Sequence, residues 1–371
     1  MSGGLDKFKH LPTGRREREV RHDLPRPSAR IYGLLLVGGV VCTVGVCVLL
    51  LALTHGGGAA IATKLDVIQT ALLFVGGSGA LAGLYVAFRK QRTDEAGDFR
   101  EQDRLFTERF TQAAAQLGSS VAAVRLAGVY ALARIADDSK RDRDACLKVL
   151  CEYLRMPPGA DSIDPADRGV RIAAQAAIAE RLCTAHPDFW SDADVDLGGA
   201  CLVELDLSHA VVRSLRLDNA TCVGATRFDG LTVSGRALVR GARFKGYAGF
   251  EGVRFGGGAC FSGSVFSEYA VFGSVEFGGT AAFEATTFEG YSIFRSATFS
   301  AAAAFTNCVF VKDVDFFQAT FLRQGGFFST TFCADAEFGG VQALPGEMRW
   351  PDGFAEPVGM EWMPLPANAA R

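Results

Sequence analysis

The sequence has few of the residues from which metal and catalytic sites are usually built. Its 371 residues include only five His and three Trp, and its ten Cys form no CxxC pair and no Cys/His cluster at metal-ligand spacing. It contains no GxSxG, no Gly-rich phosphate loop with its Lys, and no HExxH. We therefore expect no enzymatic activity, no cofactor and no metal site. We expect the cysteines to act as small buried apolar side chains.

An excess of charge of either sign is also missing. The chain carries 38 Lys plus Arg against 41 Asp plus Glu, a formal net charge of -3. This balance argues against a strongly basic nucleic-acid-binding protein, so we do not expect nucleic acid as a partner. With 49% hydrophobic residues the chain is too apolar to be disordered, and its length indicates two or three structural units.

Two long runs have no charged side chain, residues 31–53 and residues 67–88. Each is long enough to cross a lipid bilayer as a helix, and neither has an ionisable residue at depth, which argues against transport. Gly79 and Gly83 form a small-xxx-small pair that would let the two helices pack as a hairpin, or let two copies of the protein associate. The runs predict a two-helix membrane anchor, and a homo-oligomer stays open.

The distribution of Lys and Arg predicts how the hairpin is oriented. Residues 1–30 carry eight of them, the loop 54–66 carries only Lys64, and Arg89, Lys90 and Arg92 follow the second run. Because positive charge stays on the cytoplasmic side, both termini should be cytoplasmic, with a basic N-terminal arm at residues 1–30 and an external loop at 54–66.

Residues 93–190 are Ala-rich and charged, and their apolar residues recur at helix spacing. We expect four helices here, with Gly118 ending the first and Pro157–Pro158 ending the third. The stretch from Val124 to Leu132 resembles a HEAT- or armadillo-like helix over a few dozen residues. Two interpretations follow: a peptide-binding helical surface, or a small bundle that links the membrane to the next domain and covers one end of it.

From Val195 onward the sequence is periodic. Apolar residues first recur every five positions, at Leu197, Leu202, Leu207, Val212, Leu217 and Cys222. The step then alternates between six and five, and 19 of 21 positions are Phe, with Val233 and Val239 as the exceptions. These 19 residues form the predicted structural core ladder: Phe228, Phe244, Phe250, Phe255, Phe261, Phe266, Phe272, Phe277, Phe283, Phe288, Phe294, Phe299, Phe305, Phe310, Phe316, Phe321, Phe327, Phe332 and Phe338.

The residue two places before each centre from Phe244 to Phe338 is always small or β-branched, as at Ala242, Val253, Ser264 and Thr286. Side chains at i and i+2 of an extended strand point the same way, so the large centre and its small partner should share one face. The remaining positions are mostly Gly, Ser, Thr, Glu and Arg, including Gly256–Gly258, which suits turns and solvent.

The run Val195 to Leu207 is similar to pentapeptide repeats, A-(D/N)-L-x-x with a central Leu or Phe, and the later part resembles the Phe-centred variant of that family. The resemblance covers residues 195–340. It implies a right-handed, four-sided parallel β-helix with one repeat per side, in which the centre and the small residue two before it fill the interior.

Four sides of five, six, five and six residues would make a 22-residue coil. Phe228, Phe250, Phe272, Phe294, Phe316 and Phe338 should then stack at about 4.8 Å per coil, with the extra residues in wider corners. Each end of such a solenoid is an open edge that needs a cap. The helical region could cap the first coil and residues 341–371 the last, although we expect Pro345 onward to be mostly irregular.

The fold class is therefore mixed: a membrane hairpin, a small α-helical domain and a β-helix. Its expected function is a scaffold for an unidentified protein partner at the cytoplasmic membrane face, with the lipid bilayer as its other contact. The alternative is a DNA mimic, because some pentapeptide-repeat proteins resemble a DNA duplex and inhibit type II topoisomerases. However, residues 196–338 carry 14 acidic and 11 basic residues, which is a weak net charge for a phosphate mimic.

A rod without any specific partner is a further alternative, and aromatic residues outside the ladder can distinguish it from a scaffold. These are Tyr247, Tyr269, Tyr291, Phe317 and Phe328. If several of them line one face, that face is a candidate docking surface. If they scatter or point inward, an inert rod is favoured.

Overall fold

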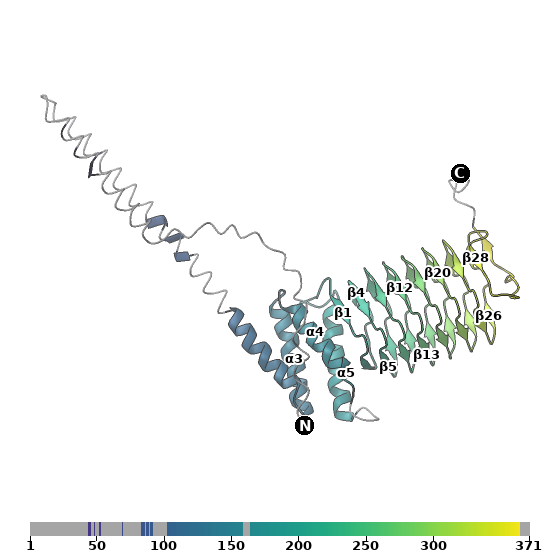
Figure 1. Ribbon diagram of the computed structural model, residues 1–371, viewed down its shortest axis with the longest axis horizontal. Helices are drawn as coiled ribbons and strands as arrows, with labels where there is room; N and C mark the ends of the chain where they lie inside the picture. Colours follow the sequence, from purple (N-terminus) through teal and green to yellow (C-terminus); the bar gives the residue numbers. More distant parts are fainter. Residues whose placement is uncertain are drawn as a thin grey trace, which may run out of the picture. The chain divides into compact units, whose positions relative to one another are not determined.

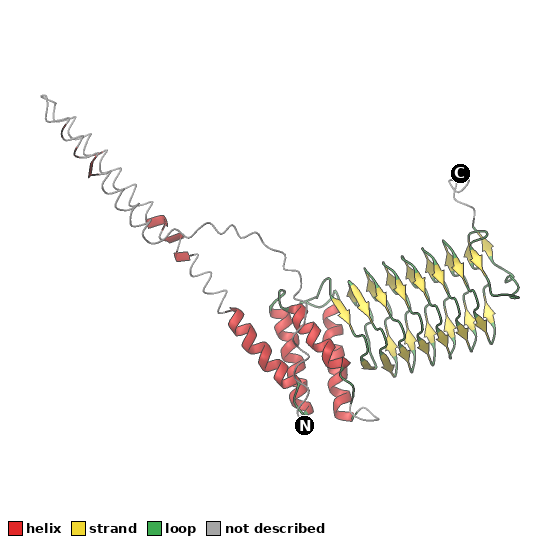
Figure 2. Cartoon of the chain, viewed as in Figure 1, coloured by secondary structure: helices red, strands yellow, loops and turns green. Residues whose placement is uncertain are grey.

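The computed structural model describes residues 102–158 and 164–363, together with scattered positions between 44 and 91. The chain divides into two compact units, Met1–Glu101 and Gln102–Arg371. The second unit begins with helices and continues as a solenoid of short parallel strands (Figures 1 and 2).

The two runs expected to cross a membrane, residues 31–53 and 67–88, fall almost entirely outside the described residues, as do the arm 1–30 and the loop 54–66. The few positions that are described there, such as Val44, Val48 and Leu84, are helical and exposed. Within the described part of the chain, no helix combines the length and the apolar character needed to span a bilayer. The hairpin and its orientation therefore stay predictions.

The four expected helices are present. Residues 102–117 form the first, which ends just before Gly118. It is followed by α3 (Ala122–Asp138), α4 (Arg143–Arg155) and α5 (Pro165–Leu182). Helix α4 stops before Pro157, as predicted, because a proline has no N–H to continue the helix.

The strands belong to four parallel sheets, which are the four sides of the solenoid. The first sheet contains β1 (Asp194–Asp196), β4 (Ser214–Arg216), β8 (Ala237–Leu238), β12 (Ala259–Cys260), β16 (Ala281–Ala282), β20 (Ala303–Ala304), β24 (Gly325–Gly326) and β28 (Met348–Arg349). The second contains β2 (Cys201–Val203), β5 (Thr221–Val223), β9 (Arg243–Phe244), β13 (Val265–Phe266), β17 (Thr287–Phe288), β21 (Val309–Phe310) and β25 (Thr331–Phe332).

The third sheet contains β6 (Thr226–Arg227), β10 (Ala248–Gly249), β14 (Ala270–Val271), β18 (Ser292–Ile293), β22 (Val314–Asp315) and β26 (Ala336–Glu337). The fourth contains β3 (Val211–Val212), β7 (Thr232–Val233), β11 (Arg254–Phe255), β15 (Glu276–Phe277), β19 (Thr298–Phe299), β23 (Thr320–Phe321), β27 (Gln342–Ala343) and β29 (Glu361–Trp362). Together they form a right-handed parallel β-solenoid of about eight turns.

The strand register confirms the predicted coil lengths. Asp194 pairs with Ser214, so the Leu-centred first coil has 20 residues, whereas Ala259 pairs with Ala281 and later coils have 22. The predicted Phe stack is also confirmed. The ring centroids of Phe250 and Phe272 lie 4.5 Å apart and those of Phe294 and Phe316 lie 4.8 Å apart.

Two kinds of corner alternate around each coil. Every fifth-residue step is a tight turn whose third residue has positive φ, at intervals of eleven residues from Gly230 (φ 68°) through Ser274 (51°) to Gly340 (65°). Each six-residue step is a wider bend, which is where the extra residue goes, as expected. At these bends the coils approach closely: a side chain on Gly257 would collide with the carbonyl oxygen of Gly235, so Gly256–Gly258 is a structural turn.

Small polar residues in the interior add a second set of bonds between coils. The hydroxyl of Thr286 donates to the carbonyl of Phe261 over 2.9 Å, and the thiol of Cys308 donates to the carbonyl of Phe283 over 2.8 Å. Ser264 and Thr330 make the same contact to Val239 and Phe305. These bonds explain why the position two before the centre accepts hydroxyl and thiol groups as well as Ala.

The helices cap the first coil. The side-chain amide of Gln175 on α5 pairs with the backbone of Val203 on β2, accepting from its N–H over 3.0 Å and donating to its C=O over 2.6 Å. The buried guanidinium of Arg171 donates to the carbonyls of Leu154 and Cys201, and Arg155 donates to that of Asp196. Backbone groups that would form an open edge are thus satisfied by side chains.

The expectation of an irregular chain from Pro345 onward is wrong. Strand β28 pairs with β24 and β29 pairs with β27, so the solenoid continues to Trp362. The ring of Trp350 stacks on Phe327 at 5.3 Å, and Phe354 packs on Phe332 at 5.1 Å. These two residues extend the ladders with a Trp and an off-register Phe, which is why the Phe spacing alone did not reveal them.

Replacing Phe283 by Ala should destabilise the solenoid by about 3–5 kcal/mol, because the ring is fully buried between those of Phe261 and Phe305. Urea unfolding measures this loss. The matched control is Phe328→Ala, whose ring is 55% exposed and which should change the free energy of unfolding by less than about 0.5 kcal/mol. Equal losses at the two positions would contradict the ladder as the source of stability.

Replacing Gln175 by Leu should open the cap locally, because the N–H and C=O of Val203 lose their partners in a buried position. We expect hydrogen exchange of the Val203 amide to accelerate at least tenfold. Gln112→Leu, on the exposed side of the first helix, is the control and should leave that amide unchanged. Unaltered protection of Val203 in the Gln175 variant would show that the cap does not depend on this side chain.

Candidate functional site

The interior of the solenoid holds the predicted ladder. Eighteen of the 19 ladder Phe residues are buried, and Phe332, near the far end, is partly buried. Rings stack along the axis at about 4.5–5.3 Å and meet their neighbours edge to face, as Phe250 meets Phe261 at 5.6 Å and 88°. Interiors packed in this way have little room for a ligand, so a site on the solenoid should lie outside it.

The buried cysteines have no reactive character. Burial raises the pKa of the Cys222 and Cys308 thiols to about 12, and the same holds for Cys146 and Cys151 in α4. At neutral pH these groups are protonated and poor nucleophiles. Within residues 102–158 and 164–363, no group of His, Cys, Asp and Glu side chains is arranged to hold a metal ion.

Four of the five aromatic residues outside the ladder lie on one side of the solenoid. Tyr247, Tyr269 and Tyr291 are spaced by 22 residues and stand in one column, beside strands β10, β14 and β18, and Phe317 follows β22 on the same side. Phe328 follows β24 and lies on the opposite side. We call the outer surface of the sheet β26-β22-β18-β14-β10-β6 the tyrosine face.

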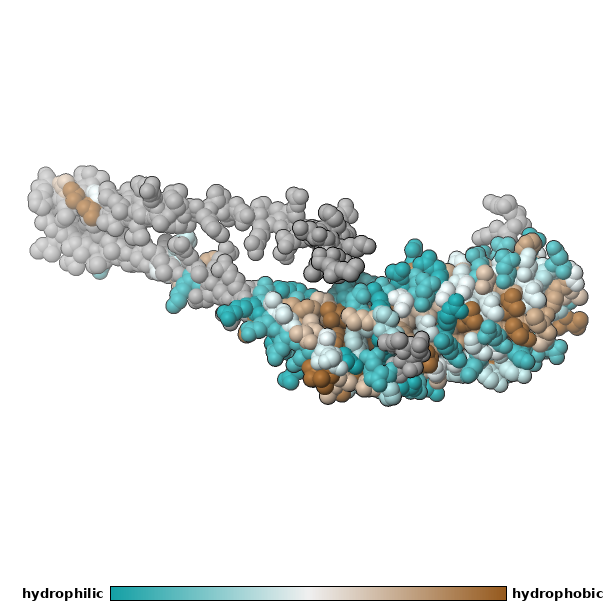
Figure 3. All heavy atoms as spheres, turned by 60° about the horizontal axis from the view of Figure 1, so that its bottom comes forward, coloured by the Kyte–Doolittle hydropathy of each residue, from teal (hydrophilic) through white to brown (hydrophobic). Residues whose placement is uncertain are grey.

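The centre of the tyrosine face is apolar and open. Tyr269 and Tyr291 are 49% and 42% exposed, and their rings stack with centroids 5.3 Å apart. Val271 and Ile293 are paired neighbours in the adjacent strand column and are partly exposed. Figure 3 shows one side of the molecule, where apolar side chains along the solenoid lie between hydrophilic ones.

This face already accommodates one guanidinium. The Arg295 side chain lies over the ring of Phe317, 5.5 Å from its centroid, and donates to Asp315 over 2.6 Å. A carboxylate and an aromatic ring together suit arginine, which stacks and donates in the same plane. The face can therefore bind side chains that combine an apolar stem with positive charge.

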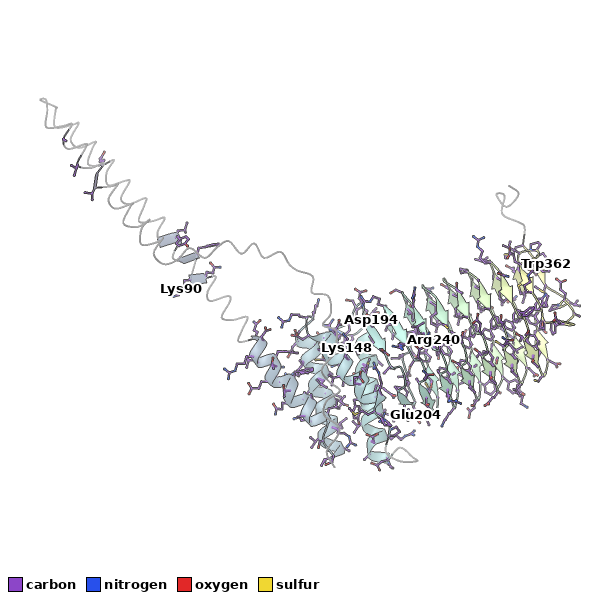
Figure 4. The ribbon with its side chains drawn as sticks, viewed as in Figure 1. Lys90, Lys148, Asp194, Glu204, Arg240 and Trp362 are labelled. Carbon is purple, nitrogen blue, oxygen red and sulfur yellow. The ribbon has the colours of Figure 1, made fainter. Side chains whose placement is uncertain are left out.

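Charge is separated along the solenoid. Residues 213–254 carry eight basic and three acidic side chains, a net of +5, whereas residues 311–363 carry three basic and eight acidic ones, a net of -5. Figure 4 marks the two ends, with Asp194 and Glu204 near the helices and Trp362 in the last strand. This distribution does not support the DNA-mimic alternative, because a phosphate mimic needs negative charge along its whole length.

An ion-pair chain links the cap to the first coils. Asp196 lies 3.4 Å from Arg155 of α4 and 3.5 Å from Arg216, and Arg216 and Arg240 both pair with the buried Asp218 carboxylate, at 2.9 and 2.7 Å. Hydrogen bonds from Arg240 and Arg216 lower the pKa of Asp218 to about 2, in spite of its burial. Each group has a partner inside the fold, so we assign this chain of charges to stability.

The helical region has its own concave surface. The first helix and α3 border an open depression of about 250 Å³, lined in part by Arg109, Gln112, Arg134 and Ile135. The predicted peptide-binding surface would fall here, and it stays a prediction. The second interpretation, a bundle that covers one end of the β-helix, is confirmed by the contacts of α4 and α5 with β1 and β2.

Comparisons with known proteins add no further information. No protein-family model matches this chain, no curated protein is significantly similar to it, and no solved structure matches its fold. The functional argument therefore depends on the geometry of the described residues.

Sequence reasoning found the aromatic residues of the tyrosine face but not the face itself. Val271, Ile293 and Arg295 were not predicted as surface residues of interest, although their distances of 22 residues from other members of the face were a usable signal. Applying the coil length to the outward positions, as well as to the ladder, would have placed them together.

Lowering the pH should remove the contribution of Asp218. Because its folded-state pKa is lowered to about 2 from an ordinary value of 3.8, the carboxylate stabilises the fold above about pH 4, and this stability is lost as the pH falls toward 2. We expect the difference in free energy of unfolding between the wild type and Asp218→Asn to shrink over this range in urea titrations. A variant with both Arg216→Gln and Arg240→Gln should lose the same pH dependence. Parallel curves for the wild type and Asp218→Asn would contradict this assignment.

Proposed function

We propose that this chain is a non-enzymatic scaffold of the pentapeptide-repeat type, which binds a protein partner through its tyrosine face. The observation that carries the proposal is the exposed, stacked pair Tyr269 and Tyr291 beside Val271 and Ile293. Side chains of this kind are enriched at the centres of protein interfaces, where tyrosine loses little conformational entropy on binding. An inert rod would not need them in one place.

The rigid frame supports this function. Residues of the tyrosine face extend from strands whose inner neighbours are locked in the Phe ladder, so the outer side chains are held at fixed spacings. A solenoid of this kind offers an extended surface without a pocket, which suits a protein partner better than a small ligand.

We also propose that residues 31–53 and 67–88 hold the scaffold at the cytoplasmic face of a membrane. The proposal follows from the length of the two uncharged runs and from the eight Lys and Arg residues of the arm 1–30. In this arrangement the helical region connects the anchor to the solenoid.

A photo-crosslinking amino acid in place of Tyr269 tests the docking surface in intact cells. We expect it to form adducts with protein, whereas the same amino acid in place of Glu276, on the next side of the solenoid, should form few. Adding Tyr291→Ser should reduce the adducts at position 269 at least tenfold, because an interface tyrosine commonly contributes 2 kcal/mol or more. Tyr130→Ser, an exposed residue of α3, is the matched control.

The outcomes separate the parts of the proposal. Adducts that persist in a form without residues 1–92 would show that the face binds independently of the anchor, and loss of that form from the membrane fraction would support the anchor. If position 269 forms no more adducts than position 276, the tyrosine face is not a docking surface.

A further inference from the structure

The outward residues of the tyrosine face are arranged so that one end complements the other. In the column of the strands themselves, the sequence along the axis is basic, small, apolar, apolar, acidic and acidic: Arg227, Gly249, Val271, Ile293, Asp315 and Glu337. Arg227 is exposed, and no ion pair is recorded for its side chain among the described residues. Such an arrangement is complementary to its own reverse.

We propose that the tyrosine face binds a second copy of this chain in an antiparallel, two-fold symmetric dimer, whose axis lies between the coils of Val271 and Ile293. The inference rests on the proposed function, in that it takes the same face as the docking surface and names its partner. Two-fold dimers use one self-complementary patch on both subunits, which is what the column provides.

The pairings follow from the fixed 22-residue coil. Rotation about this axis, which runs parallel to the strands, sets Val271 opposite Ile293 of the second copy and Tyr269 opposite its Tyr291. At the ends it sets Arg227 opposite Glu337, twice in each dimer. The apolar residues then lie at the centre of the interface and the charged ones at its rim, as is usual for protein interfaces.

A third pairing comes from the neighbouring column, which contains Glu251, Gly273 and Arg295. The Glu251 carboxylate lies over Gly273, at the place that a side chain on residue 273 would occupy. In the dimer, Gly273 faces Arg295 of the second copy. The Glu251 carboxylate is thus positioned to meet that guanidinium, which already lies between Phe317 and Asp315 of its own chain.

A parallel dimer on the same face would place like charges together. Rotation about the solenoid axis sets Arg227 opposite Arg227 and Asp315 opposite Asp315, which is repulsive. The net charges of +5 at residues 213–254 and -5 at residues 311–363 act in the same sense over the whole solenoid. Both observations favour the antiparallel arrangement.

The size of the face sets the expected affinity. Six strands at about 4.8 Å spacing give an interface about 24 Å long, at the lower end of specific protein interfaces. We expect dissociation in the micromolar range, and therefore a monomer–dimer equilibrium that shifts with protein concentration and weakens with salt.

Charge-swap variants of the full-length chain in detergent micelles test the dimer, with sedimentation velocity as the readout. Arg227→Glu and Glu337→Arg should each weaken dimerisation at least tenfold, and the double variant should restore it because the pair is rebuilt with opposite polarity. Arg243→Glu, an exposed residue of β9 on the neighbouring side, is the matched control and should dimerise as the wild type does. All four substitutions are on the surface, and thermal unfolding checks that the fold is retained.

The result that overturns the inference is a wild-type chain that stays monomeric at 100 μM or above, or a dimer that neither single swap weakens. A double variant that is no stronger than the single ones would also overturn it. The crosslinker at position 269 then separates the two proposals. Adducts with a different protein would leave the docking function in place and remove the self-association, whereas no adducts at all would remove both.

Discussion

The stacking of one phenylalanine on the next along the solenoid axis is the contact on which the rest of the structure depends. Backbone hydrogen bonds between parallel strands set the spacing of the coils, and a flat ring of nearly the same thickness fills each level of the interior. Because every ring is held between two others, a coil is stable only when its neighbours are in place. The helical cap and the closing Trp350 and Phe354 answer the same requirement at the two ends.

The periodic part of the fold was predictable because its determinants are local. A centre every five or six residues and a small residue two before it fix which side chains point inward, and the sum of four steps fixes the coil length. The cap was harder to predict. Gln175 and Arg171 occupy ordinary polar positions in a helix, and only the approach of α5 to β2 shows that they replace missing strand partners. The coil beyond Pro345 was missed because Trp350 and Phe354 follow an insertion and a proline that interrupt the spacing.

The candidate site was only partly accessible to the same reasoning. Tyr269 and Tyr291 were noticed because they are aromatic and lie off the ladder. The contributions of Val271, Arg227 and Glu337 depend on which outward positions share a side, and this needs the register as well as the residue type. A surface of this kind has no motif, since it is built from one residue per coil across more than 100 positions of sequence.

The tight corner that returns every eleven residues makes the solenoid a ruler with two marks per coil. A deletion or insertion of 22 residues would leave every inward side chain facing inward and would move everything beyond it by one coil spacing. A change of any other length would rotate the distal part to a different side, unless a wide bend absorbed the difference. The distance between the cap and any surface patch can thus evolve only in whole steps of about 4.8 Å, while the side on which the patch faces stays the same.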